Sequence, residues 1–164
     1  MLVIADTSPL IGLVRIGYVD VLPRLYQSVV IPTEVAKELS NPKRPTEVQA
    51  FMTTPPSWLS IRCPTRVEEI EGLHQGEREA ISLARELNAD LLLIDENKGR
   101  EAAIARRIRT ARTAAVLYDA ANAGVLTDLK DAFDKLRATN FRVPGKVLDE
   151  LLKQHKQQKT QPSG

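Results

Sequence analysis

The sequence has 164 residues, of which 43% are hydrophobic and 27% are charged, a composition typical of one globular domain. The net charge of +2 means that any affinity for nucleic acid must come from local basic patches. A single cysteine, Cys63, excludes an internal disulfide and a cysteine-rich zinc site. With only two histidines, a metal would be a hard cation bound by oxygen ligands. No apolar run approaches the ~18 residues of a membrane span, and no basic segment precedes the first apolar run, so we expect a cytoplasmic protein without membrane contacts.

Apolar runs alternate with amphipathic segments along the chain. Residues 2–5 are uninterruptedly apolar, which predicts a strand buried on both faces of a parallel sheet. Further strands are predicted at residues 28–31, 58–61, 91–94 and 109–112. Helices are predicted at residues 9–16, 19–26, 33–39, 45–52, 75–88, 98–107, 113–123 and 127–137, the last of them capped by Thr127. This alternation predicts an α/β fold with a mainly parallel sheet.

The domain is expected to cover residues 1–152. Its last apolar stripe lies at residues 147–152. From Lys153 onwards the chain is polar and rich in glutamine, which predicts a disordered tail over residues 153–164.

Two apolar strands, far apart in the sequence, both end on an aspartate. Asp6 follows the run at residues 2–5, and Asp95 follows the run at residues 91–94. In an open α/β sheet the carboxyl ends of the strands border the crevice that binds ligands. If the two strands are neighbours, both acids face this crevice. Either aspartate could alternatively serve only as a helix N-cap or a turn residue.

Glutamates on two helices extend this acidic set. Glu77 lies on the core-facing side of its helix, where a charge is costly unless it is paired or holds a metal. It could alternatively do no more than complement the positive helix N-terminus. On the helix at residues 33–39, Glu38 lies at the edge of the buried stripe, whereas Glu34 is expected to face solvent. Gly76 would allow another group to approach the backbone closely.

Four neighbouring acids repel one another unless a divalent cation binds among them. Mg²⁺ or Mn²⁺ takes one or two carboxylates directly and retains several waters. Such a cation assists hydrolysis by activating water and stabilising phosphate oxygens, so phosphodiester hydrolysis fits the pattern best. Ser8, two residues past Asp6, could bond an acid or a water there, or act only as a helix N-cap.

The acids described above lie in four sequence blocks, VIADTSPLI (3–11), IPTEVAKEL (31–39), LHQGEREAISLA (73–84) and LLLIDENKGR (91–100). These blocks and their order resemble those of the PIN-domain superfamily of metal-dependent ribonucleases. The likeness is greatest to the small prokaryotic proteins related to toxins of VapBC-type toxin–antitoxin modules. The chain departs from the family at Glu77, where aspartate is more usual, and over residues 108–115, which lack the family's glycines.

The resemblance implies a three-layer α/β/α sandwich and an acidic Mg²⁺ or Mn²⁺ site. By motif position the catalytic acids would be Asp6, Glu38, Glu77 and Asp95, with Asp6, Glu77 and Asp95 as the metal ligands. It also implies an RNA substrate, a homodimer and an antitoxin partner.

Basic residues crowd the segment after Asp95. Lys98 and Arg100 follow the strand directly and are the best candidates to bind substrate phosphates, although such residues often only face solvent or pair with nearby glutamates. Aromatic residues make up only 4% of the chain, so no base-stacking platform is evident.

We therefore expect a Mg²⁺- or Mn²⁺-dependent endoribonuclease that resembles a toxin of a toxin–antitoxin module. The alternative is a non-catalytic PIN-like module that binds nucleic acid or a protein partner. A phosphoacceptor receiver domain also places aspartates at strand ends, but it needs paired acids where Thr7 and Ser8 follow Asp6 here.

Overall fold

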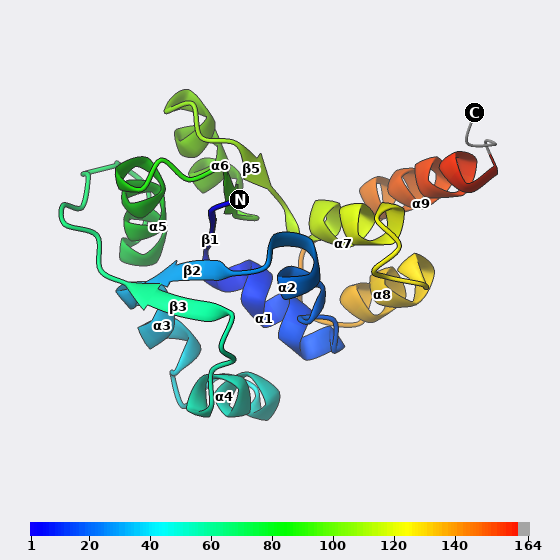
Figure 1. Ribbon diagram of the computed structural model, residues 1–164, viewed down its shortest axis with the longest axis horizontal. Helices are drawn as coiled ribbons and strands as arrows, with labels where there is room; N and C mark the ends of the chain where they lie inside the picture. The colour runs from blue at the N-terminus through cyan, green and yellow to red at the C-terminus, as the bar shows by residue number, and fades with distance from the viewer. Residues whose placement is uncertain (161–164) are drawn as a thin grey trace.

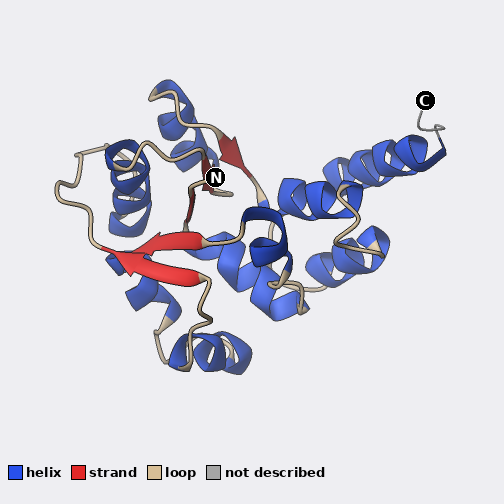
Figure 2. Cartoon of the chain, in the orientation of Figure 1, coloured by secondary structure: helices blue, strands red, loops and turns tan. Residues whose placement is uncertain are grey.

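A computed structural model describes residues 1–160 of the chain. Its centre is a sheet of five parallel strands in the order β3-β2-β1-β4-β5. The strands are β1 (Val3–Ala5), β2 (Val29–Pro32), β3 (Leu59–Arg62), β4 (Leu91–Leu93) and β5 (Thr110–Ala111). Figure 2 shows the strands surrounded by helices.

The helices follow the predicted order closely. They are α1 (Thr7–Ile16), α2 (Val21–Tyr26), α3 (Thr33–Leu39), α4 (Thr46–Thr53), α5 (Gln75–Glu86), α6 (Asn97–Ala105), α7 (Thr113–Asn122), α8 (Leu129–Arg137) and α9 (Gly145–Thr160). Asp128, and not Thr127, caps α8, because the Asp128 side chain accepts a hydrogen bond from the Asp131 N–H at 2.9 Å.

The alternating side chains of the strands divide the core in two. Val3 and Ala5 point into the larger cluster, which α1, α2, α3 and α7 help to build, whereas Ile4 points into the cluster formed with α5 and α6. All three residues are fully buried, so β1 is covered on both faces. The molecule is therefore a three-layer α/β/α sandwich, as predicted (Figure 1).

The direction of chain progression across the sheet reverses at β1. The chain runs from β1 outwards to β2 and β3, and then returns to the other side of β1 to form β4 and β5. The carboxyl ends of β1 and β4 consequently lie side by side, with Ala5 paired to Leu93. This is the switch point at which open α/β sheets bind ligands.

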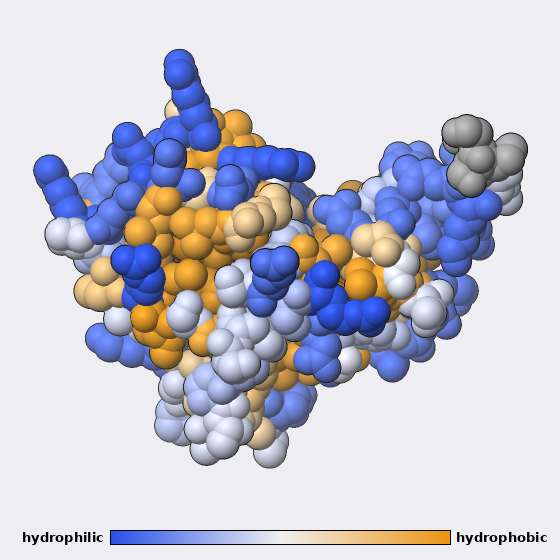
Figure 3. Space-filling view, viewed as in Figure 1, coloured by the Kyte–Doolittle hydropathy of each residue, from blue (hydrophilic) through white to orange (hydrophobic). Residues whose placement is uncertain are grey.

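Helices α7, α8 and α9 pack together beside the sandwich, and α9 extends away from it (Figure 1). The structure corrects the predicted tail, because α9 continues to Thr160 and His155 is buried, with its Nδ1 2.7 Å from the Asn122 side-chain oxygen. The rest of the predicted tail, residues 161–164, lies outside the described residues. Hydrophilic side chains cover α9, whereas apolar ones gather over the strands between α5 and α2 (Figure 3). No helix within residues 1–160 is long and apolar enough to cross a membrane.

Candidate active site

Asp6 lies at the carboxyl end of β1, where the chain turns into α1. Its backbone N–H donates to the Leu93 carbonyl oxygen at 2.9 Å, which fixes it beside the end of β4. The side chain is only 3% exposed, and its Oδ1 has no hydrogen-bond partner among the described residues. Burial raises the Asp6 pKa to about 7, with further increases from the charges of Glu77 and Glu38. Asp6 occupies the N-cap position of α1 but makes no side-chain capping bond.

Glu38 reaches the same place from α3. The Thr7 hydroxyl donates a short hydrogen bond to Glu38 Oε2. The Glu38 carboxyl lies directly against Gly76 at the start of α5, where a Cβ atom would come within 3.1 Å of the carboxyl carbon. Gly76 therefore leaves room for a side chain of the protein itself. The Glu34 carboxylate lies 3.8 Å from Lys37 Nζ. Among the described residues it forms no hydrogen bond with Asp6 or Glu38.

Glu77 completes the cluster from the first turn of α5 and is 4% exposed. Its Oε1 lies 2.6 Å from His74 Nε2, while Oε2 has no hydrogen-bond partner among the described residues. Oε2 instead faces Gly99 on α6, where a Cβ atom would stand 2.8 Å away. Burial raises the Glu77 pKa and the charges of Glu96 and Glu38 add to the increase, whereas His74 opposes it.

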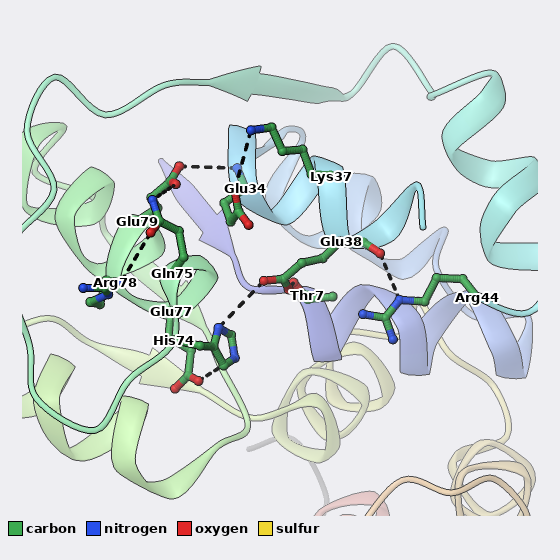
Figure 4. A network of polar contacts seen from close by, with 10 residues as sticks. All are labelled: Thr7, Glu34, Lys37, Glu38, Arg44, His74, Gln75, Glu77, Arg78 and Glu79. Carbon is green, nitrogen blue, oxygen red and sulfur yellow. Dashed lines mark hydrogen bonds and ion pairs between the residues drawn. The ribbon is translucent and has the colours of Figure 1, made fainter. Parts of the chain in front are cut away.

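His74 lies between two of these acids, as Figure 4 shows. Its Nε2 contacts Glu77, and its Nδ1 is 3.7 Å from Glu38 Oε1. Sequence reasoning missed this residue. Its position three residues before Glu77, at the N-cap of α5, is a signal that could have found it, because residues at this spacing meet on a helix.

Among the described residues, Asp95 makes its side-chain hydrogen bonds with α7 and not with the other acids of the site. Its Oδ1 accepts from the Thr113 N–H at 2.9 Å, and its Oδ2 accepts from the Thr113 hydroxyl at 2.7 Å. Burial raises its pKa, which these bonds and the charges of Arg112 and Arg100 oppose. Asp95 is therefore bonded to the start of α7. The acids whose charges act on one another are Asp6, Glu38 and Glu77. Sequence reasoning also missed Glu96, the neighbour that acts on Glu77.

The supporting residues differ from those that the sequence predicts. Of the two hydroxyls after Asp6, the Thr7 hydroxyl binds Glu38, whereas exposed Ser8 bonds no acid among the described residues. Lys98 is exposed near Gly72, which belongs to the loop before α5. Arg100 is partly buried near Asp95, and its Nε has no hydrogen-bond partner among residues 1–160.

Glu79 fixes the relative position of the two helices that carry the glutamates. Its Oε1 accepts from the Thr33 hydroxyl at 3.0 Å. The same oxygen accepts from the Glu34 N–H at 3.3 Å, and Oε2 accepts from the Gln75 amide at 3.0 Å (Figure 4). A buried carboxylate on α5 therefore satisfies donors in the first turn of α3.

The donor set fits a hard divalent cation. Asp6 Oδ1 and Glu77 Oε2 are buried oxygens without hydrogen-bond partners among the described residues, and burial together with the charges of neighbouring glutamates raises the pKa of both acids. Within residues 1–160, no group of three or more His, Cys, Asp or Glu side chains is arranged so that all of them could hold one metal ion. Mg²⁺ needs only one or two carboxylates, because waters supply its other ligands.

Comparison with known proteins agrees with this architecture. The family model DUF3368, described as a PIN domain, matches residues 2–157. A solved PilT N-terminus domain protein, SSO1118 from the hyperthermophilic archaeon Sulfolobus solfataricus P2, superposes with a TM-score of 0.56 at 19% identity, over 73% of this chain and 92% of that chain. No curated protein matches the sequence. Since the family model spans nearly the whole chain, the protein belongs to the PIN-domain family, whose fold is of the nuclease type.

Proposed function

We propose that the protein is a Mg²⁺- or Mn²⁺-dependent endoribonuclease that hydrolyses RNA phosphodiester bonds. The observation that carries the proposal is the pair of buried carboxylate oxygens, on Asp6 and Glu77, that have no hydrogen-bond partner among the described residues at the switch point of the sheet. Keeping such groups buried without a ligand costs free energy, so their retention favours a bound cation over a purely structural role.

In this proposal Asp6 and Glu77 hold the cation, with Glu38 beside them. A bound cation of this kind supplies water activation and stabilises the charge that develops on phosphate oxygens. The Thr7 hydroxyl holds Glu38 in place, and His74 holds one oxygen of Glu77, which leaves the other without a hydrogen-bond partner among the described residues. Asp95 keeps the end of β4 joined to α7, which places Arg112 at the crevice edge.

Cleavage of labelled RNA tests the proposal. Purified protein is incubated with structured and single-stranded RNAs in Mn²⁺, in Mg²⁺ or in EDTA, beside Asp6→Asn and the matched surface control Asp20→Asn. We expect metal-dependent cutting by the wild type and by Asp20→Asn, and loss of at least a hundredfold in Asp6→Asn, which lacks a charged ligand. Equal cutting by Asp6→Asn would show a contaminant and contradict the proposed site. Binding of RNA without any cutting would favour a non-catalytic module.

We also propose a homodimer and an antitoxin partner, on the resemblance to VapBC-type toxins alone. Molar mass in solution, measured by light scattering with and without a candidate antitoxin, tests both.

A further inference from the structure

A cavity lies at the carboxyl end of β4. Its volume is about 500 Å³, and its walls come from residues 95–97, from Arg112 and from the loop between α8 and α9. Asp95 and Glu96 belong to one wall. Asp95 lies two residues past Leu93, whose carbonyl oxygen accepts from the Asp6 N–H, so the cavity and Asp6 lie at the same edge of the sheet. Arg112 and Arg142 contribute its two positive charges. Neither Lys98 nor Arg100, which the sequence predicts as substrate contacts, is among its lining residues.

Arg112 is held in a defined place at this cavity. It is the N-cap residue of α7, and one guanidinium nitrogen donates to the Asn97 side-chain oxygen at 2.6 Å. The charges of Arg112 and Asp95 interact. Because a guanidinium carries five N–H donors, Arg112 keeps donors for a ligand after this contact.

Arg142 faces the cavity from the loop between α8 and α9, the orange loop of Figure 1. Its neighbours on both sides, Phe141 and Val143, are partly buried against the main core. Phe141 packs so closely on Gly12 of α1 that a Cβ atom there would stand 3.0 Å from its ring. The Arg142 side chain itself is exposed, and it forms no hydrogen bond or ion pair with any other described residue. The loop is thus anchored on either side of an arginine that is available to bind.

We propose that Arg112 and Arg142 form a subsite for an RNA phosphate next to the scissile one. Guanidinium groups form charge-assisted, often bidentate hydrogen bonds with phosphate oxygens, and this cavity holds two of them. The neighbouring ends of β1 and β4 favour a nucleic-acid strand as the ligand, since a strand whose scissile phosphate lies at Asp6 would reach this cavity past Asp95. The inference rests on the proposed function for the identity of the ligand.

The test measures binding separately from cutting. Anisotropy of a labelled single-stranded oligoribonucleotide in EDTA, over a series of salt concentrations, gives the affinity and its salt dependence. We expect Arg142→Gln to weaken binding on the order of tenfold, as for a lost charge-assisted hydrogen bond, and to reduce the slope of log K against log salt by about 0.7. Arg112→Gln should act similarly, whereas Lys153→Gln on the exposed face of α9 should change neither quantity.

The possible outcomes distinguish the phosphate subsite from the proposed nuclease function. If Arg142→Gln binds RNA like Lys153→Gln, the subsite is wrong even where the wild type cuts RNA. If the wild type never cuts RNA but loses affinity in Arg142→Gln, the subsite stands and the nuclease proposal fails. An acidic peptide that binds the wild type as tightly as RNA does, with the same dependence on Arg142, would overturn the assignment to nucleic acid. Thermal unfolding and Arg142→Lys, which keeps the charge and should retain most of the salt slope, control for loss of fold.

Discussion

The ionised form of Asp6 is electrostatically unfavourable, because its carboxyl is buried and lies near the charges of Glu77 and Glu38. Its pKa of about 7 in the folded protein lies above the ordinary value of 3.8. The unfolded chain therefore releases this proton at a lower pH than the folded protein does. As pH rises from about 4 to about 7, Asp6 makes folding progressively less favourable.

Asp6→Asn should consequently stabilise the metal-free protein at alkaline pH. The difference between 3.8 and about 7 sets an upper bound of about 4 kcal/mol on the gain in unfolding free energy. The gain should shrink towards zero near the ordinary pKa of aspartate, where Asp6 is protonated in both states. Urea unfolding in EDTA across this pH range measures it, with Asp20→Asn as the control. A variant that is less stable than the wild type at alkaline pH would show that the Asp6 charge is compensated.

Sequence reasoning could find the acids but not their partners. Asp6 was identified because it follows a buried strand. Glu77 and Glu38 were identified because the helical periodicity places them on, or at the edge of, the buried side of their helices. Which oxygen is bonded and which is free depends on side-chain contacts between distant elements. The Thr7–Glu38 bond and the engagement of Asp95 by Thr113 were therefore beyond reach.

At the scale of elements, the site depends on how α3 and α5 are held together. Glu79 provides that link, since its buried carboxylate accepts three hydrogen bonds from residues in the first turns of both helices. Glu38 lies one turn further along α3 than Glu34, so any shift of α3 moves Glu38 relative to Glu77.

Glu79→Ala should therefore reduce both stability and activity. We expect a loss of about 2 kcal/mol or more in unfolding free energy, because donors in the first turn of α3 lose a charged acceptor. RNA cutting should fall as well, measured well below the unfolding temperature so that the variant remains folded. Glu69→Ala, which removes an exposed ion pair with Arg78, should change little. Full activity in a destabilised Glu79→Ala would show that α3 keeps its place without this link.

Most elements were predictable because hydrophobic periodicity is local. The errors fall where tertiary contacts decide. Residues 153–160 are polar in sequence, yet they continue α9, where His155 is buried and its ring lies against Asn122 of α7. Thr127 and Asp128 are both good caps, and only the structure shows that Asp128 accepts the bond.

At the scale of the whole molecule, the order of the strands creates the site. The sequence indicates a parallel sheet but cannot give the pairing that places β1 beside β4, because strand order depends on contacts far apart in the chain. That order brings Asp6, the glutamates of α3 and α5, and the Arg112–Arg142 cavity to one edge of the sandwich. The proposed function requires this edge to bind a divalent cation through ionised Asp6.

Calorimetric titration with Mn²⁺ measures this binding together with the protons that it releases. Run one pH unit below the Asp6 pKa of about 7, in buffers of different ionisation enthalpy, it counts the protons that metal binding displaces. We expect the wild type and Asp20→Asn to release about one proton or more per Mn²⁺, and Asp6→Asn to bind Mn²⁺ at least tenfold more weakly. Binding by the wild type without proton release, or equally tight binding by Asp6→Asn, would contradict the proposed cation site.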